Sequence, residues 1–169
     1  MIFQDEARFG RMNDPMACWA PLPIRPLVGA QLVREFVYVY GAVSPLDGCH
    51  DSLILPDANT TSMVYFIGEL VRRHPDEYLL LFMDQAGWHK STAKQLPEHV
   101  EIAFLPPYCP DCNPQEQVWD EVREKAFGNR VFDSLDAVMD QAEVGLNELE
   151  ATPRRLQSLA GYPWILEAI

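Results

Sequence analysis

Two segments decide the fold of this chain, LLLFMDQAGWHKS (residues 79–91) and LPPYCPDCNPQEQVW (residues 105–119). The first opens with an apolar run over residues 78–83 that is too short for a helix, which predicts a strand buried on both faces. Asp84 follows this run directly, at the strand end where open α/β sheets place their ligands. A lone Asp in such a position can also simply start a turn.

The second segment follows another short apolar run, residues 100–105, which predicts a second strand. The prolines after it exclude regular structure up to Asn113. A helix is then expected, with Asn113 as N-cap, Pro114 in the first helical position and Glu116 in the third. Glu116 has two interpretations, because its carboxylate can close a capping box or bind a metal, and taken alone the capping interpretation is favoured.

The amino terminus supplies a third carboxylate. Residues 1–9, MIFQDEARF, alternate apolar and polar side chains as a strand does, yet Asp5 stands in the middle, and strands disfavour Asp. Carboxylates from a first strand, a later strand end and a following helix suit two hard divalent cations. Such a pair can activate a water or hydroxyl and stabilise the leaving oxygen of a phosphodiester.

Three blocks of this sequence, FQDEARFG, MDQAGWHKS and LPPYCPDCNPQEQVW, resemble the signature blocks of DDE transposases from bacterial insertion sequences in the mariner-like superfamily. The resemblance covers nearly the whole chain, including SLAGYPWI near its end. It implies an α/β fold of the ribonuclease-H-like kind shared with retroviral integrases, a mixed five-stranded sheet flanked by helices. It also implies that Asp5, Asp84 and Glu116 each donate one metal ligand. The chain departs from the family in a slightly short Asp84 to Glu116 spacing and in the cysteines at positions 109 and 112.

By this resemblance, the expected function is that of a transposase catalytic domain. Two Mg²⁺ ions, for which Mn²⁺ should substitute, would support cleavage of DNA at element ends and transfer of the strand to target DNA. Two other functions stay open. One is a nuclease or resolvase of the same fold without strand transfer, and the other is an inactive transposase remnant that acts as a binding domain.

The charge of the chain bears on its expected partner, DNA. With 25 acidic and 13 basic residues the formal net charge is −12, whereas DNA binding relies on Lys and Arg. This domain alone is therefore expected to bind DNA weakly. Relatives by resemblance carry a helix-turn-helix region before the catalytic domain, and here the chain starts shortly before Asp5. We expect that recognition region to be separately encoded or missing, with the chain a second reading frame, a fragment or a decayed copy. A homodimer could form in the DNA complex.

Four residues are candidates for DNA contact. Arg8 and Arg11, together with Arg25, cluster with Trp19 in a segment rich in Pro and small residues, and residues 13–28 are expected to be irregular or a loosely formed hairpin. Basic residues interleaved with an aromatic side chain can grip a nucleic-acid backbone. Packing of Trp19 on the core is the favoured alternative. His89 and Lys90 follow Asp84 in what is expected to be a loop, residues 85–91, where they could contact phosphate or assist proton transfer. Such residues also occur on loops for solubility alone.

Length and composition indicate one domain over residues 1–169, with 48% hydrophobic residues. The absence of a long apolar run or a signal-type start predicts a cytoplasmic protein without membrane contact. The four cysteines, Cys18, Cys49, Cys109 and Cys112, do not form a secreted disulfide framework, so reduced thiols are expected. The CxxC at positions 109–112 is weakly indicative of zinc or redox chemistry.

The other elements are read from periodicity. Strands are expected over residues 35–43 and 49–55, antiparallel to each other. A helix follows, with an N-cap within residues 59–62 and an apolar stripe from Met63 to Val71, and it crosses over to the strand before Asp84. The carboxyl third is expected to be helical, with Asp133 as the N-cap of its long helix.

Overall fold

A mixed sheet forms the centre of the computed structural model, which describes residues 1–13, 15–93 and 96–168. Its five strands within these residues lie in the order β3-β2-β1-β4-β5. Strands β1, β2 and β3 pair antiparallel, whereas β4 runs parallel to β1 and β5 runs parallel to β4. The strands are β1 (Ile2–Met12), β2 (Leu32–Val43), β3 (His50–Leu55), β4 (Leu79–Met83) and β5 (Val100–Phe104). The predicted five-stranded mixed sheet is confirmed.

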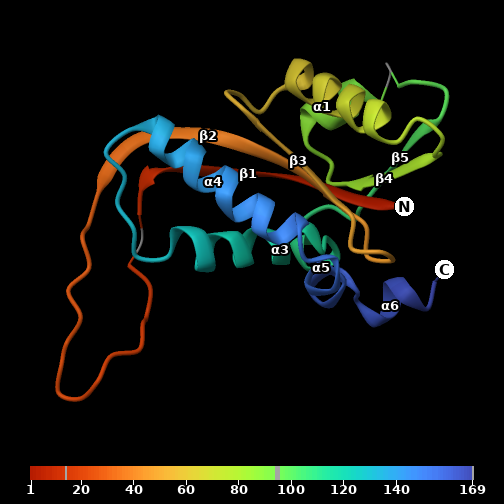
Figure 1. Ribbon diagram of the computed structural model, residues 1–169. Coiled ribbons are helices and arrows are strands. Elements are labelled where there is room, and N and C mark those ends of the chain that lie inside the picture. Colours follow the sequence, from red (N-terminus) through yellow and green to blue (C-terminus); the bar gives the residue numbers. More distant parts are fainter. Residues whose placement is uncertain (14, 94–95, 169) are drawn as a thin grey trace.

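Helices cover both faces of this sheet (Figure 1). One face carries α1 (Thr60–Arg73) and the short α2 (Gly87–Thr92). The other face carries α3 (Gln115–Val122), α4 (Leu135–Glu150) and α5 (Pro153–Ala160). A 3₁₀ turn, η1 (Pro110–Cys112), precedes α3, a π-helical turn, η2 (Arg123–Phe127), extends it, and α6 (Pro163–Leu166) lies near the chain end.

The alternation of side chains along β1 assigns its residues to two separate cores. Phe3, Ala7 and Phe9 pack with Trp119 and the helices α3 to α6. On the opposite face of the sheet, Leu81 of β4 packs with α1 in the second core. Because successive strand residues point to opposite faces, Asp5 faces α3, and its neighbour Glu6 faces the α1 and α2 side. The two neighbouring carboxylates of β1 therefore lie on opposite faces of the sheet.

Local hydrogen bonds explain where the helices begin. Of the N-cap candidates predicted within residues 59–62, Asn59 caps α1, because its Oδ1 accepts from the backbone N of Ser62 at 2.9 Å. For α4 the prediction was wrong by one residue, since the side chain of Ser134, and not of Asp133, accepts from the backbone N of Ala137.

The expectation of a loop over residues 85–91 was wrong, because α2 begins at Gly87 within it. The Asp84 carboxylate accepts a hydrogen bond from the backbone N of Ala86 at 2.8 Å, which orders the chain just before the helix. Burial of His89 and Thr92 then stabilises the helix from its inner face. Gly87 itself lies in the first turn of α2.

Residues 15–31 project from the sheet as a long loop (Figure 1). It contains Pro15, Pro21, Pro23 and Pro26, and proline disfavours regular structure. Residues 15–31 accordingly form neither a helix nor a strand. Trp19 within it has a relative exposure of 103%, so the favoured interpretation that Trp19 packs on the core was wrong.

A disulfide joins Cys109 and Cys112 next to η1, contrary to the expectation of reduced thiols, while Cys18 and Cys49 are free.

Within residues 1–13, 15–93 and 96–168, every helix falls short of the length and apolar character that a membrane span requires.

Candidate metal and nucleic-acid site

The three predicted carboxylates line one cavity of about 420 Å³. Asp5 reaches it from the middle of β1, Asp84 from the residue after β4, and Glu116 from the first turn of α3. The other wall is the loop from Leu105 to Pro110, together with Lys90. Residues that are far apart in sequence thus face a shared volume. Their ligand oxygens do not all lie within 4.8 Å of one another, so the three carboxylates are spaced more widely than the ligands of one compact ion site.

Asp5 is the most buried of the three carboxylates. The indole N–H of Trp119 donates to its Oδ2 at 3.0 Å, and this is the one side-chain hydrogen bond to Asp5 among the described residues. Burial, followed by the charges of Glu116 and Glu6, raises the pKa of Asp5 from 3.8 to about 8. No Lys or Arg of the described chain forms an ion pair with it. A bound cation would offset this repulsion, so the donor set fits a divalent metal ion.

The buried side chain of His89 contacts both Asp84 and Glu6. His89 on α2 is fully buried, and its Nδ1 lies 2.6 Å from Asp84 Oδ1 while its Nε2 lies 2.9 Å from Glu6 Oε1. Burial disfavours the charged imidazole, but the two carboxylates outweigh burial and raise the pKa of His89 to about 10. An imidazolium donates from both nitrogens, so His89 orients Asp84 and is itself oriented by Glu6.

The hydrogen bonds at the start of α3 leave the Glu116 carboxylate out of the helix cap. Asn113 Oδ1 accepts from the backbone N of Gln115 at 3.2 Å. The backbone N of Asn113, which a capping box would offer to Glu116, instead donates to the carbonyl of Pro110 at 2.8 Å. Burial is the main cause that raises the pKa of Glu116, with Asp120 and Asp84 adding to it and Arg123 opposing it. Glu116 is therefore available for a cation.

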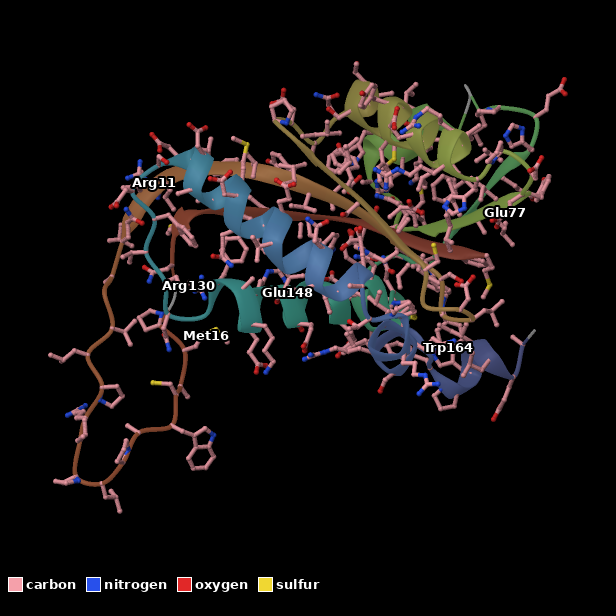
Figure 2. The ribbon with its side chains drawn as sticks, in the orientation of Figure 1. Arg11, Met16, Glu77, Arg130, Glu148 and Trp164 are labelled. Atoms are coloured by element: carbon pink, nitrogen blue, oxygen red, sulfur yellow. A yellow bond between two sulfur atoms is a disulfide. The ribbon has the colours of Figure 1, made fainter. Side chains whose placement is uncertain are left out.

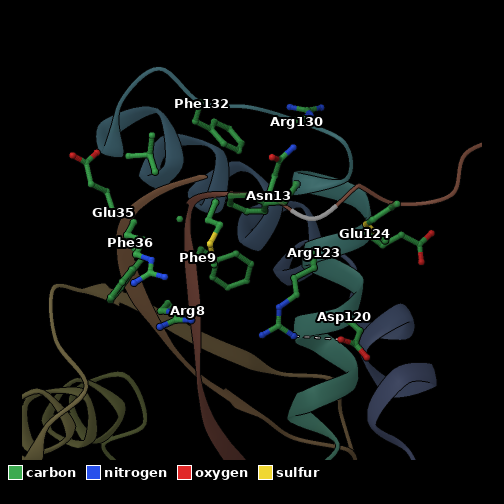
Figure 3. A pocket seen from close by; sticks show the side chains of 16 residues that line it. Arg8, Phe9, Asn13, Glu35, Phe36, Asp120, Arg123, Glu124, Arg130 and Phe132 are labelled. Atoms are coloured by element: carbon green, nitrogen blue, oxygen red, sulfur yellow. Dashed lines mark hydrogen bonds and ion pairs between the residues drawn. The ribbon is translucent and has the colours of Figure 1, made fainter. Parts of the chain in front are cut away.

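A second and larger cavity, of about 900 Å³, is lined by residues of β1, β2, α3 and η2 (Figure 3). Arg8 lies over the ring of Phe36 at 4.6 Å, and Arg123 lies over the ring of Phe9 at 5.7 Å. Arg123 also pairs with Asp120 at 3.3 Å. Asp120, which lines this cavity, follows Glu116 of the carboxylate cavity by one helical turn, so the two cavities lie about one turn of α3 apart.

The structure separates the four candidates for DNA contact into two pairs. Lys90 is exposed at the carboxylate cavity and Arg8 is exposed at the larger cavity. Arg11 instead donates to Glu35 and to the carbonyl of Phe132, which indicates a structural role. His89 is buried with both ring nitrogens engaged, which leaves it no free nitrogen for DNA and favours its holding of Asp84.

A family model described as DDE superfamily endonuclease matches residues 1–139. The chain belongs to this family. An uncharacterised protein of Sinorhizobium fredii (strain NBRC 101917 / NGR234) is 32% identical over 130 residues, which cover 76% of this chain and 96% of that protein.

Solved structures with the same fold include two of the Mos1 transposase. A pre-cleavage Mos1 transpososome has a TM-score of 0.60 and 14% identity over 95% of this chain. A mariner Mos1 paired-end complex with Mg has a TM-score of 0.59 and 15% identity over 95% of this chain. This DDE endonuclease chain covers 56% and 55% of those two chains, so it spans about half the length of each. The expected ribonuclease-H-like fold is confirmed.

The sequence predicted that the three carboxylates would lie together, as they do at one cavity, but not the residues that form hydrogen bonds with them. The position of Trp119, three residues after Glu116, was a usable signal, because i and i+3 share a helix face. Glu6 had no such signal, because its contact with His89 joins residues that are 83 positions apart. Arg123 carried no sequence signal that distinguished it from other surface arginines.

Proposed function

We propose that this DDE endonuclease chain is the catalytic domain of a DNA transposase, which cuts DNA at element ends and joins the cut strand to target DNA. The observation that carries the proposal is the meeting of Asp5, Asp84 and Glu116 around one cavity from three separate elements. The Mos1 neighbours, described as transpososome and paired-end complexes, support DNA as the substrate.

The proposed metals are two Mg²⁺ ions, with Mn²⁺ able to substitute. Mos1 complexes with Mg and with Mn are among the structural neighbours. Burial and the charges of Glu116 and Glu6 raise the pKa of Asp5 to about 8, and a cation would stabilise its ionised form. Bound between these carboxylates, the ions would supply an activated water and charge stabilisation at the phosphorus.

In the proposed reaction, neighbouring side chains hold the metal-binding carboxylates in place. Trp119 fixes the carboxylate of Asp5, and His89 fixes that of Asp84. In the first step a water oxygen bonds to phosphorus as the P–O3′ bond breaks, which leaves a 3′ hydroxyl and a 5′ phosphate. In the second step that 3′ oxygen bonds to a target phosphorus and loses its proton, while the target's own 3′ oxygen leaves and takes up a proton.

The proposed DNA path runs from the carboxylate cavity along α3 to the larger cavity of Figure 3. Lys90 lies at its start, while Arg123 and Arg8 lie further along it and could neutralise phosphates. The net charge of −12 limits the affinity, so we propose that sequence recognition comes from a separate domain or partner. A homodimer in the DNA complex is also proposed, and particle mass measured with and without DNA tests it.

Cleavage of a labelled DNA duplex in the presence of Mg²⁺ tests the function. Asp84→Asn, Asp5→Asn and Glu116→Gln should each abolish metal-dependent nicking while the fold is retained. Asp111→Asn in η1 is the matched control, because it removes an exposed carboxylate from the adjacent turn. Unaltered nicking by Asp84→Asn would contradict the assignment of the site.

A joining assay separates transposition from simple hydrolysis. A pre-cut element end with a free 3′ hydroxyl is offered with supercoiled target DNA. Joined product that depends on the three carboxylates supports a transposase. Cleavage without joining would indicate a nuclease or resolvase, and the absence of both reactions together with absent metal binding would indicate an inactive remnant.

A further inference from the structure

A second cluster of ionisable side chains lies outside the carboxylate cavity, at the outer strand of the sheet. Among the described residues, Cys49, Asp51 and His74 are the one group of three or more His, Cys, Asp or Glu whose ligand atoms all lie within 4.8 Å of one another. Asp51 pairs with Ala42 of β2, which pairs with Gln4 of β1. Two strand spacings therefore separate Asp51 from β1, roughly 10 Å.

The chain brings these three residues together through the geometry of β3 and α1. Cys49 and Asp51 are two residues apart in extended chain, so their side chains share one face. His50 between them points to the other face, where its ring lies 6.2 Å from that of Trp119. His74 ends α1, and its Nε2 lies 2.7 Å from Asp51 Oδ2.

Two neighbours orient the side chains of this cluster. Glu77 Oε1 lies 3.2 Å from His74 Nδ1, so the nitrogen that faces away from Cys49 and Asp51 already has a carboxylate partner. Such a carboxylate behind a ligating histidine is a common feature of metal sites. Arg73 holds Asp51 Oδ1 at 2.9 Å and leaves Oδ2 directed at His74. Figure 2 shows Glu77 at the end of the molecule opposite Arg11.

The surroundings of the cluster are strongly negative. Burial raises the pKa of the Cys49 thiol to about 11, followed by the charges of Asp51, Asp47, Glu77 and Glu150. Arg73 and His74 offset only part of this charge. A divalent cation would neutralise the remaining negative charge and would favour the thiolate form of Cys49 over the thiol.

We propose that Cys49, Asp51 and His74 bind one Zn²⁺ ion, with water as the fourth ligand. A thiolate, an imidazole and a carboxylate suit zinc, whereas Mg²⁺ prefers oxygen ligands alone. Ligand atoms around tetrahedral zinc lie roughly 3.5 Å apart, so the 2.7 Å contact of His74 with Asp51 would open on binding. The ion would connect the edge strand β3 to the end of α1 and stabilise both.

Titration of the metal-free full chain with Co²⁺ as a spectroscopic substitute for Zn²⁺ tests the proposal. The protein carries Cys109→Ser and Cys112→Ser, so that this disulfide pair cannot supply thiolates to the cobalt ion. We expect one equivalent of Co²⁺ to produce a thiolate-to-cobalt charge-transfer absorption, which Zn²⁺ then displaces and a large excess of Mg²⁺ does not.

Single variants assign the ligands. Cys49→Ser and His74→Gln should remove the absorption, and Glu77→Gln should weaken binding about 10- to 100-fold. Cys18→Ser should leave it unchanged, because Cys18 is the other free and exposed cysteine. Asp84→Asn should also leave it unchanged, which makes the result independent of the proposed catalytic function. Persistence of the absorption in Cys49→Ser, or its absence from the starting protein, would overturn the proposal.

Discussion

At the residue scale, Asp5 and Asp84 lie in one cavity but have opposite electrostatic environments. Burial and neighbouring carboxylates raise the pKa of Asp5 to about 8, whereas the hydrogen bond from His89 is the main cause that lowers the pKa of Asp84. The ionised form of Asp5 is therefore destabilised in the metal-free protein, and that of Asp84 is stabilised. Burial of the Asp5 carboxylate therefore lowers the stability of the metal-free protein at a pH where this group ionises.

This contrast predicts opposite effects of two matching substitutions. At pH 8 without metal, Asp5→Asn should raise the free energy of unfolding by roughly 1–3 kcal/mol, because it removes a buried and unpaired carboxylate. Asp84→Asn should lower it by roughly 0.5–1 kcal/mol, since the half-exposed ion pair with His89 is lost. Urea denaturation followed by circular dichroism measures both.

The pH dependence of the free energy of unfolding is a second test of the predicted effect of Asp5→Asn. A carboxyl with a raised folded-state pKa makes stability fall as pH rises from its unfolded pKa near 4 to its folded pKa near 8. The advantage of Asp5→Asn should therefore be small at pH 4 and largest at pH 8. Mg²⁺ should stabilise the wild type and not Asp5→Asn. An equal loss of stability in both variants would contradict this account of the cavity.

At the element scale, the close contact between β2 and α3 holds Trp119, whose indole N–H donates to Asp5, in position. A Cβ added at Gly41 would lie 2.5 Å from Cη2 of Trp119 and 2.6 Å from the amide nitrogen of Gln115. Gly41→Ala should therefore displace Trp119 from Asp5 and lower the free energy of unfolding by roughly 1–3 kcal/mol. Nicking should fall with it, because Asp5 loses its positioning hydrogen bond.

Gly68 on α1 provides the control for this substitution. A Cβ there would meet nothing within 4 Å, and alanine is the better helix former by about 1 kcal/mol. Gly68→Ala should leave nicking unchanged and increase stability slightly in chemical denaturation. If Gly41→Ala were as well tolerated as Gly68→Ala, the close packing of Trp119 against β2 would not be what holds the indole.

The sequence predicted those elements that local patterns determine, and it missed those that depend on contacts between distant residues. Continuous apolar runs and capping residues predicted the strands, α1 and the placement of Asp84 and Glu116, because these signals are local. The helix α2 was missed, since its order comes from burial of His89 against Glu6, a contact between distant residues. Trp19 was misassigned for the converse reason, because an aromatic side chain usually packs inward but here occupies a projecting loop.

At the scale of the whole molecule, the acidic charge and the proposed DNA path act against each other. With a net charge of −12, the isolated chain should bind a DNA duplex only weakly and only at low salt. Cations between the three carboxylates would reverse the local field. We therefore expect Ca²⁺, used as a non-catalytic substitute, to increase DNA affinity in wild type and not in Asp84→Asn.

The salt dependence of that affinity identifies the residues along the path. Arg8→Ala and Lys90→Ala should each weaken binding and reduce the slope of log affinity against log salt by roughly 1, since each removes one phosphate contact. Arg154→Ala is the matched control, because it removes the same charge from an exposed position on α5, outside both cavities. Fluorescence anisotropy with a labelled duplex measures these slopes. Equal losses in all three variants would show that the chain responds only to its total charge, and the proposed path along α3 would then be wrong.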